Sequence, residues 1–290
     1  MYILLISEKE DLEKRNCIMI IIKTIHDYEY SPFINNCYVF RGQSKECYSL
    51  LPGAYRSENN VKNLGPKIEI EWVQQFIHHL WERGYHTFPG DLNEYNIFTT
   101  SSRVFPTDEM LPYLAVAQHY APSSEFHSLK TSLLDITYNL DIAAYFAANQ
   151  HYEDNGKIFV FDKSSIKSPY QIFEPHLDKR QEARMIVQDG AFIYREQKYE
   201  FEAEMYSYKK YEPFDDIVFD TIIIPSVLKE ELREHLRKKL FDSLLLPRLI
   251  LGQRTVFMPS IGERNYEEIK ELYKPQIDEA MNEGNRHKKY

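Results

Sequence analysis

This sequence mixes short β-prone runs with helix-patterned segments, and that mixture constrains its fold more than any other feature. The clearest β-prone run, Phe219–Ile224, ends at Pro225, and Ser226 then provides an N-cap for a helix to about residue 239. Strands and helices do not alternate at the regular spacing that a doubly wound parallel sheet requires. The sequence therefore predicts the α+β class. Further strands are predicted over residues 37–41 and 157–161 and around Phe192 and Ile193.

Helical patterns occur along the whole chain. Ser7 followed by Glu10 has the spacing of a capping box and predicts a helix over about residues 8–28. Apolar residues spaced three and four apart predict another helix over residues 67–83. Helices are also predicted over about residues 109–120, 139–149 and 263–273.

The charge balance argues against a broad nucleic-acid or membrane surface. The 290 residues include 35 Lys and Arg against 44 Asp and Glu, which gives a formal net charge of −9. Such a balance opposes electrostatic binding to nucleic acid or anionic lipid. No apolar stretch approaches the roughly 20 residues that cross a bilayer. We therefore expect no membrane partner and no strong nucleic-acid partner, while a homo-oligomer stays open.

The cysteines indicate a reducing compartment. Cys17, Cys37 and Cys47 are odd in number and lack the paired spacing of a zinc site. Free and mostly buried thiols are expected, with no metal. The N-terminal residues show no basic region followed by a small-residue cleavage site, so no signal peptide is predicted. The expected location is the cytoplasm.

The segment Phe40-Arg41-Gly42-Gln43-Ser44 closes a predicted strand and carries the first candidate site residues. A guanidinium with five donors suits a phosphate- or ribose-bearing ligand. Gly42 lets a ligand approach the backbone, and Gln43 and Ser44 add uncharged donors. The alternative is that Arg41 pairs with a carboxylate at the edge of the core, and the pentapeptide alone does not decide between them. No Gly-rich phosphate loop, HExxH or GxSxG accompanies this segment.

Two further segments combine titratable and polar residues. The first contains Ala117-Gln118-His119-Tyr120 and resumes at Thr131–Thr137, with Asp135 among apolar neighbours. Asp135 either orients a histidine or an arginine, or caps the following helix. The second runs from Arg184 to Phe192, with Arg184 and Gln188 four residues apart.

The order of these motifs resembles the FRG domain family, which takes its name from a Phe-Arg-Gly motif. The family text reads close to AQHYGLPTRLLDWTxNPxxALYFA. This chain has AQHY at 117–120, LLDIT at 133–137, Asn139 and AAYFA at 143–147, and RxxxQxGAF follows at 184–192. The resemblance covers about residues 35–250. It divides the chain into an N-terminal helical segment (1–34), an FRG-like domain (35–250) and a C-terminal helix with a polar tail (251–290).

The resemblance implies a fold and a function. The family's motifs are similar in order to those of ADP-ribosyltransferases, which implies a mixed or antiparallel split sheet flanked by helices. It also implies an NAD-consuming enzyme, a transferase or a glycohydrolase, in a toxin or phage-defence setting with a macromolecular target or phage protein as partner. Catalytic roles then fall to Arg41, His119, Tyr120, Asp135 and Gln188. Binding of NAD falls to Gly42, Gln43, Ser44, Thr131, Thr137, Tyr145 and Arg184.

The chain departs from the family text at several positions. Residues 121–127 are inserted after AQHY, Ser132 replaces an arginine and Ile136 a tryptophan. Where a strand glutamate would hold the ribose, the chain has Gln188, Asp189 and Gly190. These departures favour an alternative, a non-catalytic nucleotide- or protein-sensing module. A third interpretation is that the motifs form a buried polar network that specifies the fold.

Overall fold

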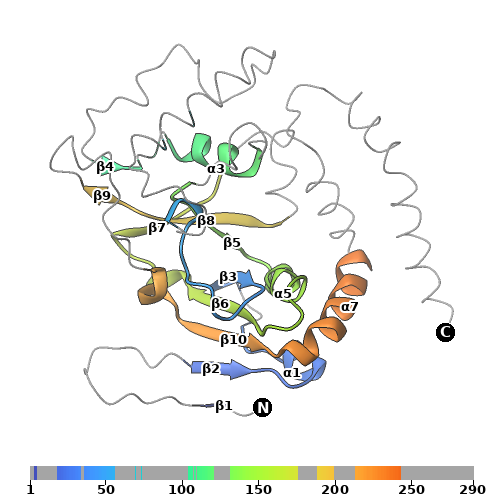
Figure 1. Ribbon diagram of the computed structural model, residues 1–290. Coiled ribbons are helices and arrows are strands. Elements are labelled where there is room, and N and C mark those ends of the chain that lie inside the picture. The colour runs from blue at the N-terminus through green and yellow to red at the C-terminus, as the bar shows by residue number, and fades with distance from the viewer. Residues whose placement is uncertain are drawn as a thin grey trace, which may run out of the picture.

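The computed structural model describes residues 3–4, 18–33, 36–55, 69, 73, 104–106, 108, 110–120, 131–175, 188–198 and 213–242. Its centre is an eight-stranded sheet with the order β1-β2-β10-β6-β3-β5-β8-β7 (Figure 1). The strands are β1 (Ile3–Leu4), β2 (Ile18–Ile21), β3 (Tyr38–Gln43), β5 (Leu134–Thr137), β6 (Gly156–Asp162), β7 (Tyr170–Phe173), β8 (Gly190–Arg195) and β10 (Asp220–Ile224). A second sheet pairs β4 (Val104–Phe105) with β9 (Gln197–Lys198).

The main sheet is mixed, because β2 and β10 run parallel while the other neighbouring strands run antiparallel. The described α-helices are α1 (Ile25–Glu29), α3 (Leu111–Tyr120), α5 (Leu140–Ala148) and α7 (Ser226–Asp242). Short 3₁₀ turns occupy Gly53–Tyr55, Lys163–Ser165 and Phe214–Ile217. The predicted α+β class with a mixed sheet is therefore confirmed. None of the helices in the described ranges is both long and apolar enough to cross a bilayer.

Two apolar cores lie on opposite faces of the main sheet. Along β3, Phe40 belongs to the core shared with α5 and α7, whereas Val39 belongs to the other core, as the alternation of side chains along a strand requires. Helix α7 turns Leu228, Leu232 and Leu236 toward the first core, at the spacing of a helix stripe. The second core is closed by Phe214 and its neighbours in the 3₁₀ turn before β10.

Helix α5 lies unusually close to β3 because Gly42 has no side chain. A Cβ atom at Gly42 would stand 1.8 Å from the carbonyl oxygen of Ala143 and 3.0 Å from the backbone nitrogen of Ala147. Both alanines are fully buried. Gly42 thus has a packing role that is independent of any ligand.

Lys229 ties helix α7 to the end of β3 and to the loop after α5. Its side chain is fully buried, and Nζ donates to the carbonyl oxygens of Ser44, Gln150 and His151 at 2.7, 2.8 and 2.8 Å. Burial lowers the pKa of the ammonium, while the carboxylates of Asp154 and Glu153 oppose that shift. One buried cation therefore joins three segments that are distant in sequence.

Most of the predicted elements in the described ranges are confirmed. The strands predicted over 37–41 and 157–161 are β3 and β6, Phe192 and Ile193 lie in β8, and the strand before Pro225 is β10. The helices predicted over 109–120, 139–149 and from residue 226 are α3, α5 and α7. The predicted helices 67–83 and 263–273 and the Ser7–Glu10 capping box lie outside the described residues, apart from Glu69 and Val73.

Two predictions are wrong. The helix expected over residues 8–28 is contradicted by β2, because the isoleucine-rich run Ile18–Ile21 pairs with β10, and only α1 is helical in the described part of that range. The thiols of Cys37 and Cys47 are exposed rather than buried, since Cys37 precedes β3 and Cys47 lies in the loop after it. Cys17 and residues 251–290 lie outside the described residues, and the division of the chain into three parts stays a prediction.

Replacing Gly42 tests the close packing of α5 on β3. Gly42→Ala should lower the free energy of unfolding by about 2–3 kcal/mol, because the new methyl group overlaps the backbone of Ala143. Urea denaturation followed by circular dichroism measures the change. Val227→Ala is the control, since Val227 is 91% exposed and should change stability by less than about 0.5 kcal/mol. Equal stabilities of the two variants would contradict the packing described here.

Replacing Lys229 tests the three-carbonyl contact. Lys229→Met keeps much of the apolar stem but leaves three carbonyl oxygens without this donor, so unfolding should become easier by about 2–4 kcal/mol. Lys238→Met makes the same change at an exposed position of the same helix and should be nearly neutral. Thermal and urea melts of both variants decide the matter, and a neutral Lys229→Met would refute the structural role.

Candidate functional site

The candidate site lies where the main sheet opens between β3 and β5. These strands are paired only at Phe40 and Thr137, whereas β3 stays paired with β6 along its whole length and β5 with β8 (Figure 1). A cavity of about 540 Å³ occupies the opening, within the range of roughly 300–1,000 Å³ that is typical of small-molecule sites. It is lined by Phe40, Arg41, Gly42, Gln43, Ser44, Tyr48, Gln118, Asp135, Ile136, Thr137, Ile142, Phe146, Asn149, Gln150 and Gln188.

Arg41 bridges the two strands beyond their last pair. Its Nη1 donates to the backbone carbonyl oxygen of Asp135 at 2.6 Å and lies 3.6 Å from Oδ2 of the same residue. The Arg41 side chain is 14% exposed and contributes to the cavity wall. The contact with a carboxylate, one of the two alternatives from the sequence, is therefore present, while binding of a ligand by Arg41 stays a prediction.

Asp135 is held by a chain of hydrogen bonds that begins at Thr131. The buried Thr131 hydroxyl accepts from the backbone nitrogen of Leu133 and donates to Oε1 of Gln118. Nε2 of Gln118 then donates to Oδ1 of Asp135 at 2.7 Å. This order leaves only one orientation for the Gln118 amide. Asp135 thus orients an arginine, as one sequence alternative held. The helix cap is Asn139, which accepts from the backbone nitrogens of Asp141 and Ile142.

Thr137 closes the far side of the site by joining β5 to the turn before β8. Its hydroxyl donates to the carbonyl oxygen of Gln188 at 2.6 Å and accepts from the backbone nitrogen of Asn139. Asp189 follows in the left-handed region with φ 48°, which an aspartate tolerates better than most residues. Burial raises the pKa of the Asp189 carboxyl, with a smaller contribution from Glu174.

Gln43 differs from Gln118 although both line the cavity. The Gln43 side chain is buried, with 6% exposure. Among the residues that the structure describes, neither its amide nitrogen nor its amide oxygen has a hydrogen-bond partner. Buried polar groups without partners are rare in folded proteins. Neither amide atom is accessible to solvent, so the amide lies beneath the surface of the cavity, and none of the residues that the structure describes satisfies it.

The described lining is electrically balanced. Arg41 is its one cation and Asp135 its one carboxylate, and the two lie in contact. The remaining polar side chains are neutral amides and hydroxyls, and Phe40, Ile136, Ile142 and Phe146 supply an apolar surface. The cavity can thus bind a ligand with a flat apolar part and amide-type polar edges more readily than a bare anion.

The other predicted site residues have different positions. Tyr145 packs against the core between the sheet and α7 rather than facing the cavity, and burial raises the pKa of its phenol. His119 and Tyr120 end α3, but their side chains, like Arg184 as a whole, lie outside the described residues. The structure therefore brings together Arg41, Gly42, Gln43, Ser44, Asp135, Thr137 and Gln188, with Thr131 behind Gln118.

Sequence reasoning assigned Tyr145 of α5 to the site but missed the residues of α5 and of the turn after it that line the cavity. Ile142, Phe146, Asn149 and Gln150 all line it. Their spacing of four, three and one residues places them on one side of the helix and its end, so periodicity in the AAYFA segment is a usable signal. Gln118 belongs to the AQHY motif, and its place near the end of a helix that precedes Asp135 in the chain is a second usable signal.

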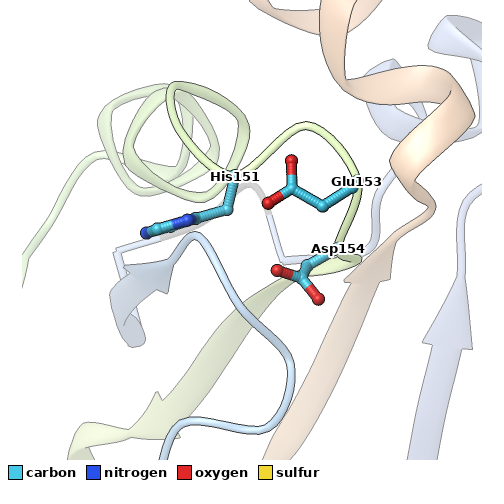
Figure 2. A group of neighbouring side chains, drawn as sticks. All are labelled: His151, Glu153 and Asp154. Carbon is cyan, nitrogen blue, oxygen red and sulfur yellow. The ribbon is translucent and has the colours of Figure 1, made fainter.

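One cluster has the donor types of a metal site. His151, Glu153 and Asp154 offer ligand atoms within 4.8 Å of one another, in the described loop between α5 and β6. Figure 2 shows the imidazole of His151 pointing away from the two carboxylates. Lys45 Nζ lies 3.1 Å from Oδ2 of Asp154, so an ammonium already provides the positive charge there. We assign no metal to this loop.

Replacing Gln118 tests the hydrogen-bond chain. Gln118→Glu puts a second carboxylate against Asp135 and should lower stability by about 1–3 kcal/mol at pH 7. Since repulsion raises the pKa of the pair only in the folded state, the folded variant binds more protons than the unfolded one. The loss relative to wild type should therefore grow as pH rises from about 4 to 7 and vanish in acid.

Gln171→Glu is the matched control for that substitution. Gln171 donates to the carboxylate of Glu196 at an exposed position of the sheet edge, so the same change should cost less than about 1 kcal/mol. Urea melts of both variants between pH 4 and 8 provide the comparison. If Gln118→Glu has no pH-dependent loss, the chain from Thr131 to Asp135 does not exist in solution.

Comparison with known proteins identifies part of the chain. The family model of the FRG domain matches residues 36–156. All residues that line the cavity except Gln188 fall within this range. No curated protein and no solved structure matches the chain. The match confirms the motifs from Phe40 to Ala147, whereas the resemblance beyond residue 156 stays a prediction. This chain carries an FRG domain at residues 36–156.

Proposed function

We propose that the cavity between β3, β5 and α5 binds NAD and that the protein consumes it, as an ADP-ribosyltransferase-like enzyme or as an NAD glycohydrolase. The observation that carries the proposal is a cavity of about 540 Å³ whose wall contains Arg41, held in place by the backbone carbonyl oxygen of Asp135. The choice of NAD as the ligand comes from the resemblance of the motifs to those of ADP-ribosyltransferases. The same resemblance suggests the biological role that we propose, which is a toxin or a phage-defence effector that acts on a macromolecular target or a phage protein.

The proposed reaction breaks the bond between the nicotinamide nitrogen and C1′ of the ribose. Nicotinamide leaves as a neutral molecule with the bonding electron pair. Water, in a glycohydrolase, or an acceptor side chain, in a transferase, forms the new bond to C1′ and loses a proton. Positive charge develops on the ribose, so a nearby carboxylate stabilises the transition state. Asp135 takes this role in the proposal because it is the one carboxylate in the described lining.

The arrangement around Asp135 assigns the remaining roles. Gln118 and Arg41 fix the orientation of Asp135, and such pre-organisation lowers the cost of reaching the transition state. Phe146 offers a flat apolar surface for the nicotinamide ring. Thr137 and Gln188 close the opposite side of the cavity.

A non-catalytic nucleotide-sensing module is the second candidate. The observation that favours it is that Asp135 already accepts from Gln118 and contacts Arg41. A carboxylate engaged in this way is less available to a developing charge on the ribose. In that case NAD or another nucleotide binds and stabilises the fold by mass action without being consumed.

Nicotinamide release from NAD tests the enzyme. Purified wild-type protein should release nicotinamide, and Arg41→Ala and Arg41→Lys should reduce the rate about tenfold or more, because the guanidinium bridges the strands that form the cavity. Arg237→Ala, on the partly exposed surface of α7, should retain the wild-type rate. Mass spectrometry of candidate acceptors distinguishes transfer from hydrolysis.

The melting temperatures of the Arg41 variants show whether a lower rate of nicotinamide release reflects lost activity or a lost fold. Arg41→Lys retains a positive charge and should melt cooperatively, so a lost rate is not a lost fold. A wild-type protein that NAD stabilises but that releases no nicotinamide would support the sensing module. If NAD neither raises the melting temperature of the wild type nor loses nicotinamide in its presence, NAD is not the ligand and the proposal is wrong.

A further inference from the structure

Two aromatic side chains in the described lining of the cavity are partly exposed. Phe40 also lines the cavity but is only 1% exposed, so the accessible aromatic surface there belongs to Tyr48 and Phe146. Phe146 lies in the last turn of α5, and Tyr48 lies in the loop after β3. An aromatic side chain that stays accessible in a cavity wall is suited to bind a flat ring by stacking.

Tyr48 contacts the loop that follows α5. Its ring meets the imidazole of His151 edge to face, with 6.2 Å between the ring centroids and 90° between the ring planes. Figure 2 shows that this imidazole points away from Glu153 and Asp154. The ammonium of Lys45 lies over the Tyr48 ring, 5.9 Å from its centroid, and so occupies one of the two faces of the ring.

The loop that carries Tyr48 is tied to the loop before β6. The backbone nitrogen of Glu46 donates to the carbonyl oxygen of Asn155 at 2.8 Å, and the side chain of Asn155 donates to the Glu46 carboxylate at 3.0 Å. Lys45 pairs with Asp154 at 3.1 Å. All of these contacts lie within the protein, so a ring that stacks on Tyr48 meets a side chain that is already held in place.

Side-chain amides lie at the same end of the cavity. Asn149 and Gln150 line it directly after α5, and both side chains are accessible. The Lys229 ammonium binds the carbonyl oxygens of Ser44 and Gln150, so the chain after β3 and the chain after α5 are held together there. The aromatic surface of Tyr48 is therefore accompanied by amides that can donate to and accept from the polar edge of a ring.

We propose that the accessible side chains at this end of the cavity form a ring subsite, made of Tyr48, Phe146, Asn149 and Gln150. In it, Tyr48 is a specificity-determining residue that stacks on a flat heteroaromatic ring of the ligand. The inference rests on the proposed function in taking NAD as the ligand, and it deepens that function by placing one ring of NAD here, with the adjoining ribose toward Arg41. Nicotinamide and adenine share the required chemistry, which is a flat ring with an amide or amino group at its edge.

Calorimetric titration of the full-length protein with NAD tests the ring subsite. Tyr48→Leu should weaken NAD binding about five- to hundredfold, because stacking on an aromatic side chain is lost. Tyr48→Phe keeps the aromatic ring and should bind NAD like the wild type. A Tyr48→Phe variant that binds NAD as weakly as Tyr48→Leu would contradict stacking.

Tyr30→Leu is the matched control for Tyr48→Leu. Tyr30 also contacts a histidine ring, that of His26, but it is 72% exposed and lies outside the described lining of the cavity. The same substitution there should leave the affinity for NAD unchanged. A loss of affinity equal to that of Tyr48→Leu would overturn the inference, because the effect would then not depend on the cavity.

The two halves of NAD, nicotinamide mononucleotide and adenosine monophosphate, show which ring is bound. One half should bind the wild type, and Tyr48→Leu should weaken its binding by about the same factor as that of NAD. The other half should show no dependence on Tyr48. Equal losses for both halves would overturn the inference, because the substitution would then distort the whole cavity rather than remove one stacking contact.

The melting temperature without ligand separates stacking on a ligand from packing within the protein. Tyr48→Phe retains the contacts with Lys45 and His151 and should melt like the wild type. If Tyr48→Leu melts at a lower temperature while its affinity for NAD stays that of the wild type, Tyr48 only packs on these two residues and the inference is wrong.

The remaining outcomes separate this inference from the proposed function. If wild type and Tyr48→Leu bind NAD equally, the ring subsite fails and NAD consumption is unaffected. If NAD binding depends on Tyr48 but no nicotinamide is released, the ring subsite holds and consumption fails. If the wild type binds neither NAD nor either of its halves, both fail.

Discussion

The contact between the Arg41 guanidinium and the backbone carbonyl oxygen of Asp135 determines the shape of the candidate site. The backbone ladder between β3 and β5 stops after Phe40 and Thr137, so a side chain joins the two strands instead. A side-chain bridge holds two diverging strands at a distance that a backbone ladder does not allow, and a cavity results. The same residue is therefore a structural cross-link and part of the cavity wall, so its pairing with Asp135 does not remove it from the cavity.

Helix α5 makes the opening rigid. Its small residues face β3, where Gly42 and Ala143 meet with no space for a Cβ atom at Gly42. Ile142 and Phe146 of the same helix line the cavity. Lys229 then fixes the loop after α5 and the residue after β3 to helix α7. Interiors packed in this way change shape little. Packing and hydrogen bonds thus hold α5 and the end of β3, which form part of the described cavity wall.

The elements that the sequence predicted are those whose local pattern and tertiary setting agree. β10 ends in three consecutive buried isoleucines directly before Pro225, and α7 has a leucine every fourth residue. The prediction fails at β2 because the Ser7–Glu10 spacing indicates where a helix begins but not where it ends, and the pairing of Ile18–Ile21 with β10 makes that run a strand. Within the site, motif order located Arg41 and Asp135. The contrast between Gln43 and Gln118 depends on which side chains meet across the opening, and a single sequence does not contain that information.

The charge balance of the cavity has a consequence for how a dinucleotide would fit. A cation in contact with a carboxylate attracts a phosphate less than an isolated cation does, since Asp135 opposes most of the field of Arg41 at a distance. Affinity must then come from hydrogen bonds to neutral amides and from apolar contact with residues such as Phe146. These favour the ring of a nucleotide over its pyrophosphate, which gains more from remaining in water. If NAD is the ligand, as we propose, the charge balance of the described cavity favours one ring-bearing half of the molecule inside it, with Arg41 beside the adjoining ribose and the phosphates left in water.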